Sequence, residues 1–345
     1  MNIAMSNVFL PTDENAGVAY QTHYLANALV DRGHDVTVFS FSAKPADGRY
    51  AIRTFASSAF SKVPGLRKFA PFVFAWHLAR TDFSSFDVVH AHGDNFLLWG
   101  AHPQVRTFHG SAYDEARNAT TLRRKLFFYV LDALERIGAR IADHNVGVSA
   151  VTKKRLGRVE TIIPCGVDLE AFRPGAKSAH PTVLFVGTNG GRKRGRWLAE
   201  AFVRDVRSQI PDAELLMVSD GDLGLDGVRS LGRVTLERLT ELYASAWVFC
   251  LPSTYEGFGV PYIEAMAAGT AVVASDNPGA RDVLAAGTFG SLPDDAALGR
   301  TLRELLQNAQ QRERFADGGR ARAEQFAWSA IAGRYEAVYA AVHHG

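Results

Sequence analysis

The sequence is poor in cysteine, nearly neutral overall and without a long apolar run. Its two cysteines, Cys165 and Cys250, lie in different predicted domains, so we expect reduced thiols and no disulfide. The formal net charge of +2 is too small to indicate nucleic-acid binding by itself. No window of about 18 apolar residues indicates a membrane-spanning helix, and residues 1–10 lack the charged and apolar regions of a signal peptide. These absences favour a cytoplasmic protein.

Short apolar runs alternate with helical patterns along the chain. Strands are predicted over residues 3–10, 36–41, 88–91, 106–109, 145–148, 182–187, 214–218, 247–251 and 271–274, and helices over residues 18–32, 196–206, 236–245 and 328–342. Such alternation is typical of parallel sheets with helices on both faces. The predicted fold class is therefore α/β.

The length of the chain predicts two domains. At 345 residues it exceeds the size at which a single core stops growing. The clearest linker is residues 172–181, which contain two prolines and few apolar side chains. We therefore expect an amino-terminal domain over residues 1–172, a carboxyl-terminal domain over residues 173–327 and a last helix over residues 328–345 that no strand follows.

The most informative segment contains two glutamates on either side of a glycine loop. Glu256 and Glu264 are separated by seven residues, and the loop over residues 257–259 follows the first of them. Pro261 suits a first helical turn, where its missing amide hydrogen costs nothing, and Gly269 suits the end of that helix. A strand, a glycine loop and a helix present free backbone amides to an anionic or hydroxyl-rich ligand. With two carboxylates beside it, this unit predicts a nucleotide-sugar site.

A second glycine-rich turn, residues 187–195, also lies between a predicted strand and a predicted helix. It carries three consecutive bases, Arg192, Lys193 and Arg194, at the edge of a sheet where ligands of α/β proteins bind. A diphosphate needs cations of this kind to neutralise its charge. The alternative is a solvated basic turn, because charged runs usually face water.

Taken together, these motifs resemble the retaining glycosyltransferases of family 4. That family has a signature of Glu, seven residues and Glu with Gly-Phe-Gly-hydrophobic-Pro inside it, as Glu256 to Glu264 have here. Further segments follow in the order of the family: residues 33–38, 87–92, 107–110, 163–168, 184–187, 231–234 and 326–328. The resemblance covers nearly the whole chain. It implies the GT-B fold, in which two Rossmann-like domains face each other across a cleft and a terminal helix crosses back to the first domain.

The resemblance implies roles for residues of the second domain. Glu264 would bind the ribose hydroxyls of the donor, and Glu256 would lie against the donor sugar or the junction of sugar and phosphate. The sugar hydroxyls would meet the loop amides, which belong to Gly257, Phe258, Gly259 and Val260. Arg194 or Lys193 would contact the diphosphate. Thr188 stands where the family usually has an arginine, so one charge of the family pattern is missing.

Two positions of the first domain complete the implied site. His109 follows a predicted strand at the point where the family has a histidine beside the reacting sugar, although a lone histidine is more often a packing residue. Gly17 retains one of two family glycines whose backbone meets the phosphates, and Ala16 replaces the other. His90 and His92 alternate on one strand face, and we interpret them as structural or acceptor-side polar groups.

The implied activity is transfer of a hexosyl group from a nucleoside-diphosphate sugar to a hydroxyl acceptor with retention of anomeric configuration. The acceptor hydroxyl would attack on the face from which the diphosphate leaves, and no metal or other cofactor would be required. The segment from Asp220 to Asp222 has the spacing of a metal motif, but it follows a strand and is interpreted as a loop. Two alternatives remain: a sugar-nucleotide epimerase of the same fold, and a catalytically idle relative that binds nucleotide sugars.

The acceptor side shows one distinctive segment. The region from Arg117 to Phe128 joins four bases to an apolar run that continues to residue 131, and residues 62–69 add more bases. Such a segment could contact an anionic membrane surface at its periphery, in keeping with the lipid-linked acceptors of many family members. From the sequence we favour the interpretation that this segment is a core helix with one solvent-exposed face.

Overall fold

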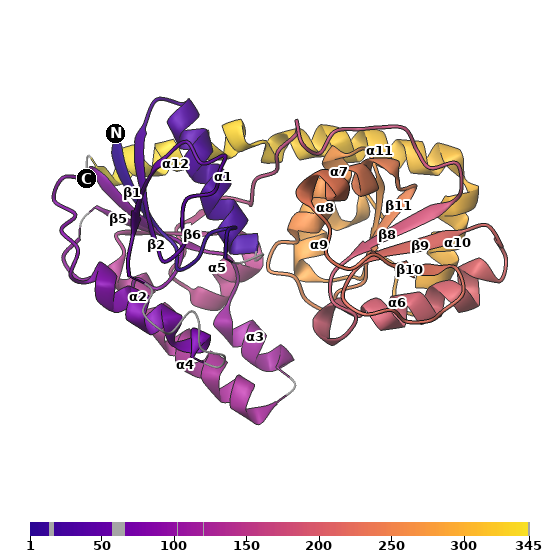
Figure 1. Cartoon of the computed structure of the whole chain (residues 1–345), viewed down its shortest axis with the longest axis horizontal. Helices are drawn as coiled ribbons and strands as arrows, with labels where there is room; N and C mark the ends of the chain where they lie inside the picture. The colour runs from indigo at the N-terminus through magenta and orange to yellow at the C-terminus, as the bar shows by residue number, and fades with distance from the viewer. Residues whose placement is uncertain (14–16, 57–65, 102, 120, 344–345) are drawn as a thin grey trace. The chain divides into compact units, whose positions relative to one another are not determined.

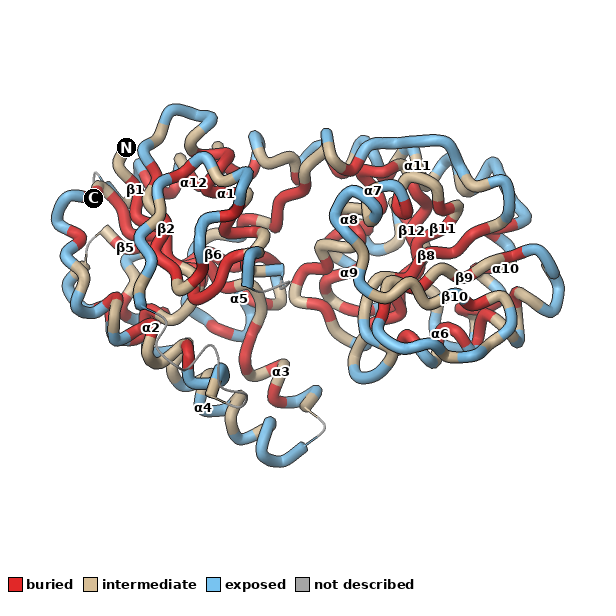
Figure 2. The backbone as a smooth tube through the Cα atoms, in the orientation of Figure 1, coloured by how far each residue is buried: buried red, intermediate tan, exposed pale blue. Residues whose placement is uncertain are grey.

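The computed structural model describes residues 1–13, 17–56, 66–101, 103–119 and 121–343. The chain divides into two compact units (Figure 1). The first comprises Met1–Gly166 together with Trp328–Gly345, and the second comprises Val167–Ala327. Each unit contains a parallel sheet with helices around it, and Figure 2 shows that the central strands of each sheet are buried.

Within the described residues, the first unit has a seven-stranded sheet in the order β3-β2-β1-β4-β5-β6-β7. Its strands are β1 (Asn2–Ser6), β2 (Asp35–Ser40), β3 (Ala51–Thr54), β4 (Val88–Ala91), β5 (Gln104–Phe108), β6 (His144–Gly147) and β7 (Thr161–Ile162). All neighbouring strands pair in parallel. Their carboxyl ends therefore meet at one edge, which is where polar side chains can gather.

Helices cover the sheet of the first unit. They are α1 (Gly17–Asp31), α2 (Ala70–Leu78) after the short η1 (Arg67–Phe69), α3 (Ala112–Asn118), α4 (Leu122–Ile141), α5 (Ala150–Leu156) and α12 (Trp328–His343). In α1, Leu25, Ala26 and Leu29 recur at helical spacing and are buried against the strands. The helix ends at Asp31, and the turn that follows contains Gly33, which adopts a φ of +88° that a residue with a Cβ rarely takes.

The second unit repeats this arrangement with a five-stranded parallel sheet, in the order β10-β9-β8-β11-β12 among the residues described. The strands are β8 (Thr182–Val186), β9 (Glu214–Val218), β10 (Val228–Ser230), β11 (Val248–Leu251) and β12 (Ala271–Ala274). The helical segments are η2 (Gly191–Lys193), α6 (Gly195–Phe202), η3 (Val203–Arg207), α7 (Leu236–Ser245), α8 (Val260–Ala267), α9 (Pro278–Val283), η4 (Ala285–Gly287), α10 (Leu298–Gln307), α11 (Ala309–Ala323) and η5 (Glu324–Phe326). The α/β class predicted from the alternating pattern is confirmed.

The division between the units differs from the linker chosen from the sequence. The sequence boundary was expected at 172/173, whereas the compact units meet at 166/167. Val167 donates its amide to Phe326 O at 2.9 Å, and Phe172 packs edge-on against Tyr243 with ring centroids 5.6 Å apart. Residues 167–172 therefore belong to the second unit, because Val167 and Phe172 contact residues of that unit, although they precede its first strand by ten residues or more.

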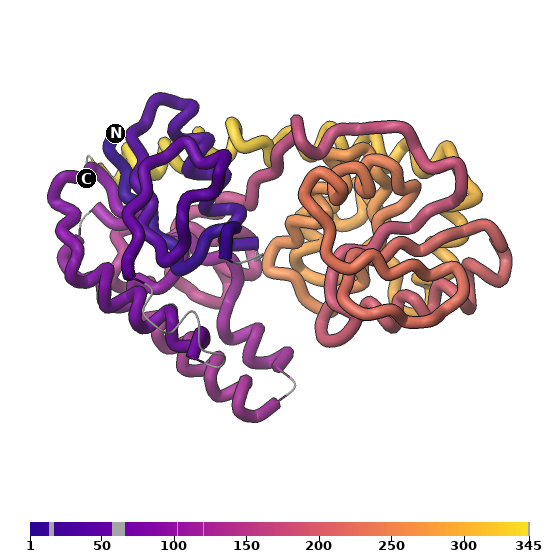
Figure 3. Tube along the Cα trace, in the orientation of Figure 1, coloured from indigo at the N-terminus to yellow at the C-terminus, as the bar shows by residue number. Residues whose placement is uncertain are grey.

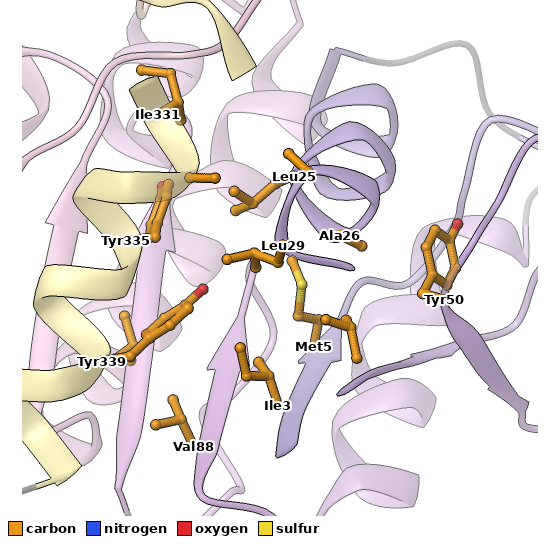
Figure 4. Close-up of a cluster of buried hydrophobic side chains, with 14 of the residues drawn as sticks. Ile3, Met5, Leu25, Ala26, Leu29, Tyr50, Val88, Ile331, Tyr335 and Tyr339 are labelled. Carbon is orange, nitrogen blue, oxygen red and sulfur yellow. The ribbon is translucent and has the colours of Figure 1, made fainter. Parts of the chain in front are cut away.

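The terminal helix α12 belongs to the first unit, as expected from the sequence. Figure 3 shows this yellow segment beside the indigo amino-terminal part of the chain. Ile331, Tyr335 and Tyr339 are buried with residues of α1 and of the strands in one apolar cluster (Figure 4). At the surface, Glu336 pairs with Arg32 at 2.6 Å and with His34 at 2.8 Å. Burial of three large side chains contributes several kcal/mol, roughly 1.5–3 kcal/mol each, so α12 is an integral part of this core.

The helix α4 corrects one expectation. The sequence favoured a core helix, but of its 20 residues only Gly138, Ala139 and Ile141, all near its carboxyl end, are buried. Large apolar side chains on the earlier turns face solvent: Leu122, Leu126, Tyr129, Val130 and Ile137.

The second basic segment predicted for the acceptor side spans residues 62–69, and residues 62–65 of it lie outside the described residues. In the part of the chain that the structure describes, no helix is long and apolar enough to cross a membrane.

Candidate active site

A first cluster of polar side chains lies where β11 ends and α8 begins, in residues 252–259. Glu256 in this connection is buried, with 6% of its surface exposed. Ser253 donates from Oγ to Glu256 Oε1 at 2.7 Å. The same oxygen lies 2.7 Å from Arg192 Nη1 and 3.4 Å from Lys193 Nζ. The cluster thus joins the carboxyl end of β11 to the turn that follows β8.

Electrostatics keep the Glu256 carboxylate charged. Burial alone would raise the pKa of Glu256, but the charges of Lys193 and Arg192 and the hydrogen bond from Ser253 outweigh it and lower this pKa. The site therefore contains one buried anion between two cations at neutral pH. Such a group can accept hydrogen bonds from a ligand or hold the cations in place.

The loop after Glu256 leads directly into the amino terminus of α8. Gly259 occupies the N-cap with φ +98°, no side chain caps the helix there, and a Cβ at this position would collide with the ring of Tyr262. Pro261 falls in the first turn, as the sequence predicts. The side chain of Phe258 is buried and packs edge-on against Phe326. A ligand contact with Phe258 would therefore involve its backbone, as the sequence predicts, and not its ring. The amide-rich end of α8 suits a negatively charged or hydroxylated ligand.

Glu264 lies one turn further along α8 in a different environment. Tyr243 donates from Oη to Glu264 Oε2 at 2.9 Å. Burial raises the pKa of Glu264 to about 7, and the Tyr243 hydrogen bond and the charge of Lys193 only partly oppose that rise. Lys193 thus acts on both glutamates of the signature. The two carboxyl groups have opposite shifts, since Glu256 has two cations within 3.4 Å and Glu264 accepts from a neutral phenol.

Arg194, the last of the three consecutive bases, is held by several protein acceptors. Its guanidinium donates to Pro252 O at 2.7 Å, to Ser275 Oγ at 2.7 Å and to both carboxylate oxygens of Asp295 at 2.7 and 2.8 Å. Arg194 therefore ties the turn after β8 to the ends of β11 and β12. Its assignment to a diphosphate stays a prediction, and Arg192 and Lys193 are the cations nearest to Glu256.

The remaining residues of this turn are held locally. Thr188 donates from Oγ1 to Gly190 O at 3.0 Å, and Asn189 donates from Nδ2 to Asp220 O at 2.7 Å. The second contact joins the turn to the loop after β9, where a pocket is lined by residues 221–222 and 228–232. Among the described residues there is no group of three or more His, Cys, Asp or Glu side chains that could hold a metal ion.

The first unit contributes two of the predicted positions, each described within that unit. Gly17 begins α1, where a Cβ would meet no atom within 4 Å, and Ala16 lies outside the described residues. His109 directly follows β5, and its Nε2 lies 2.9 Å from Nδ1 of His92. Burial lowers the pKa of His109 to about 4, so its imidazole is neutral at physiological pH.

Sequence reasoning missed two side chains that the structure brings into these clusters, and it gave no specific role to Arg192, which it named within the basic run. Ser253 and Tyr243 contact the two signature glutamates, and no local pattern in the sequence points to either of them.

Two family models match the chain. Residues 15–171 match Glycosyltransferase Family 4, and residues 180–308 match Glycosyl transferases group 1. In an alignment 375 positions long, the chain is 33% identical to the phosphatidyl-myo-inositol mannosyltransferase of Mycobacterium tuberculosis, and the alignment covers 96% of this chain and 94% of that protein. The chain belongs to glycosyltransferase family 4. The family resemblance seen in the sequence is thereby confirmed, and this family 4 member is a glycosyltransferase enzyme.

Solved structures agree on the architecture. Sucrose-phosphate synthase from Thermosynechococcus elongatus matches with a TM-score of 0.75 at 22% identity, covering 98% of each chain. Anabaena HepE in complex with UDP and glucose matches with a TM-score of 0.74 at 16% identity, covering 99% of each chain. At these identities the likeness concerns the fold alone. The family 4 glycosyltransferase described here has the GT-B fold, as the sequence predicts.

Proposed function

We propose that this glycosyltransferase moves a hexosyl group from a nucleoside-diphosphate sugar to a hydroxyl acceptor with retention of anomeric configuration. The observation that carries the proposal is the cluster of Glu256, Lys193 and Arg192 beside the amino terminus of α8. It offers positive charge for a diphosphate and a buried carboxylate for sugar hydroxyls within one short stretch of a sheet edge. In parallel α/β sheets this edge is where ligands bind.

The sheet order supports a path for the donor along the second unit. The base would lie in the pocket after β9 and β10, the diphosphate by the turn after β8, and the sugar by the loop after β11. Glu264 would accept from the ribose hydroxyls, and Lys193 would be the cation that meets the diphosphate. Arg194 holds this turn in place through Asp295 and Ser275, so it would act on the diphosphate chiefly by positioning.

The proposed reaction takes place on one face of the sugar. The bond between the anomeric carbon and the diphosphate oxygen breaks, the acceptor oxygen forms a bond to the same carbon, and the acceptor proton passes to the leaving diphosphate. Electrostatic stabilisation and positioning would lower the barrier, without a covalent sugar–enzyme bond and without a metal ion. Cations at the turn after β8 offset the charge that develops on the leaving group.

The relatives suggest the first substrates to test. The Mycobacterium tuberculosis relative is a phosphatidyl-myo-inositol mannosyltransferase. We therefore propose a mannosyl donor and an inositol-containing phospholipid acceptor.

The test of the proposed function combines binding and turnover. Thermal stabilisation by a panel of nucleotide sugars identifies the donor, because a ligand that binds the folded state raises Tm. Incubation of that donor with candidate acceptors, followed by NMR of the anomeric proton, reports transfer and its stereochemistry. Retention with turnover unchanged in EDTA is expected. An inverted product, loss of turnover in EDTA, or a changed donor with no acceptor glycosylated would contradict the proposal.

The raised pKa of Glu264 leads to a prediction on pH. If the carboxylate form binds the ribose hydroxyls, donor affinity rises with pH as Glu264 loses its proton. For a pKa of about 7 the ionised fraction, and with it the affinity for the nucleotide sugar, increases about tenfold between pH 6 and pH 8. Calorimetric titration across this range checks the rise. Glu264→Gln should bind more weakly and with a flat pH profile, and a flat profile in the unaltered protein would exclude this role.

A second part of the proposal concerns the acceptor side. We propose that α4 contacts the surface of an anionic membrane. Leu122, Leu126 and Val130 follow one another at four-residue spacing on exposed turns, with exposed fractions of 73%, 58% and 53%. The exposed bases Arg123 and Arg124 lie on the same turns. An apolar stripe flanked by positive charge matches the interfacial region of a bilayer that carries anionic lipids.

Vesicle flotation tests the role of this helix. The unaltered protein is expected to float with vesicles of phosphatidylcholine and phosphatidylinositol. The Leu126→Ser/Val130→Ser variant should bind the vesicles about thirtyfold more weakly, because each of the two lost apolar contacts weakens insertion by on the order of 1 kcal/mol. Leu236→Ser, which alters an exposed leucine on α7, is the matched control and should float normally. Equal flotation of the double variant and the unaltered protein would exclude α4 as the membrane-contacting helix.

A further inference from the structure

Three histidines of the first unit lie in contact beside its sheet. His90 belongs to β4, His92 follows that strand, and His109 follows β5. The rings of His90 and His92 have centroids 4.2 Å apart, and Nδ1 of His92 lies 2.9 Å from Nε2 of His109. One of these two nitrogens must donate and the other accept, so the pair fixes the tautomers of both rings.

All three imidazoles are neutral at physiological pH. Burial lowers the pKa of His109 to about 4 and that of His90 to about 3, and it lowers the pKa of His92 well below its ordinary value, with smaller effects from the neighbouring rings. A neutral imidazole carries one N–H, so each ring has one donor and one acceptor nitrogen. The direction of the bond between His92 and His109 therefore decides which nitrogen of His109 keeps a proton.

The other nitrogen of His92 indicates that direction. Nε2 of His92 is buried and has no hydrogen-bond partner within the described residues. A buried N–H without an acceptor is rarer in folded proteins than a buried acceptor without a donor, and either costs free energy. His92 therefore carries its proton on Nδ1 and donates it to Nε2 of His109.

A neighbouring side chain supports the same assignment. His92, His109 and Trp328 line one small cavity of the first unit, with room for on the order of one water molecule. The indole Nε1–H of Trp328 is also buried without an acceptor in the described part of the chain. An unprotonated Nε2 on His92 complements this donor, whereas a protonated one would leave two unpaired donors in the same cavity.

We propose that His92 is a positioning residue that holds His109 as its Nδ1–H tautomer, so that His109 presents a hydrogen-bond donor to a hydroxyl oxygen of the transferred sugar. The contact with sugar rests on the proposed function, whereas the tautomer is a property of the protein alone. Sequence analysis assigned His92 to structure or to the acceptor side. The hydrogen bond to His109 links His92 instead to the residue that the family resemblance places beside the reacting sugar.

Tyrosines of the terminal helix α12 hold His90, the ring that packs against His92. His90 accepts or donates at both nitrogens, with Nδ1 2.7 Å from Tyr339 Oη and Nε2 2.8 Å from Thr107 Oγ1. Thr107 Oγ1 lies 3.0 Å from Tyr335 Oη. His90 is thus fixed at two points, and its ring restrains the plane of His92 against which it packs. Rotation of His92 away from His109 would have to displace this buried network.

The tautomer can be measured on the whole protein without any substrate. In ¹⁵N-histidine NMR spectra, His109 is expected to show a protonated Nδ1 and an unprotonated Nε2. His92→Asn should preserve this pattern, because the asparagine Nδ2–H can replace the imidazole Nδ1–H. His92→Phe should abolish it and give a mixture of tautomers. A protonated Nε2 on His109 in the unaltered protein overturns the proposal, whatever the enzyme does.

Kinetics then test the consequence for catalysis. His92→Phe is expected to lower kcat about tenfold, the effect of roughly one hydrogen bond lost in the transition state, with little change in the KM for the donor. His92→Asn should retain most of kcat. Equal losses in both variants despite a preserved tautomer in His92→Asn would reduce His92 to a packing residue. If no sugar is transferred by the unaltered protein, the proposed function fails, but the NMR result still decides the tautomer.

Discussion

Glu256→Gln is expected to lower kcat by about 10²–10³-fold, the usual effect of removing one preorganised electrostatic group from an active site. Glutamine keeps the shape of the side chain and can still accept from Ser253, but it removes the negative charge between Arg192 and Lys193. A neutral amide is a weaker acceptor for the sugar hydroxyls. The freed cations would at the same time bind the donor diphosphate as tightly as before, or more tightly. The expected signature is therefore a fall in kcat without a loss of donor affinity.

Turnover assays and calorimetric titration of the donor measure the two quantities separately. Glu200→Gln is the matched control, since Glu200 lies on the surface of the same unit and its ion pair with Arg196 spans 3.9 Å between exposed side chains. This control should behave like the unaltered enzyme. A Glu256→Gln enzyme with unchanged kcat would show that the charge is not needed, and the site would have to be sought elsewhere.

Gly279→Ala is expected to displace the backbone of the loop that contains Glu256 and Phe258. Gly279 lies in α9, and a Cβ there would approach Phe258 O to 2.6 Å and Glu256 O to 2.7 Å. Both atoms are backbone, so the loop or the helix must shift as a whole. Overpacking of this kind typically costs about 1–3 kcal/mol of stability, and displacement of a site by on the order of 1 Å can lower activity about 10²-fold.

The surroundings leave α9 little room to adjust. The side chain of Asn277 caps the helix by accepting from Ala280 N at 3.0 Å, and it donates to Ser253 O at 3.1 Å and to Tyr262 Oη at 3.2 Å. Movement of α9 would therefore break contacts to both flanks of the Glu256 loop. The expected result is a lower Tm together with reduced kcat, measured by thermal unfolding and turnover.

Gly333→Ala is the matched control for this substitution. Gly333 lies inside α12, where a Cβ would come no closer than 3.6 Å to the flexible end of Arg32. Alanine favours the helix by about 0.5–1 kcal/mol relative to glycine, so Tm should rise slightly and activity should be retained. If Gly279→Ala and Gly333→Ala had similar effects, the close packing of α9 behind the loop would not matter to the site.

Regular elements could be predicted because their signals are local. Strand β9 and helix α7 begin and end at the predicted residues, since apolar spacing and terminal residues mark both ends. Strand β3 was not predicted, because its pattern of one half-buried and three exposed residues lacks the alternation expected of a strand. The membership of residues 167–172 could not be predicted either, because it depends on bonds to Phe326 and Tyr243 far along the chain.

The candidate site divides in the same way. The two glutamates and the glycine loop lie in one short segment and form the family signature, which together with the other family segments was sufficient to predict a nucleotide-sugar enzyme of the GT-B fold. Which base approaches Glu256, and that Tyr243 rather than a cation faces Glu264, depends on how separate strands and helices pack. The opposite pKa shifts of the two glutamates follow from that packing, because burial and nearby charge act through space. The sequence by itself thus determined the fold class, the family and the residue types of the site, whereas only the tertiary structure decided which charges neutralise one another and that His92 contacts His109.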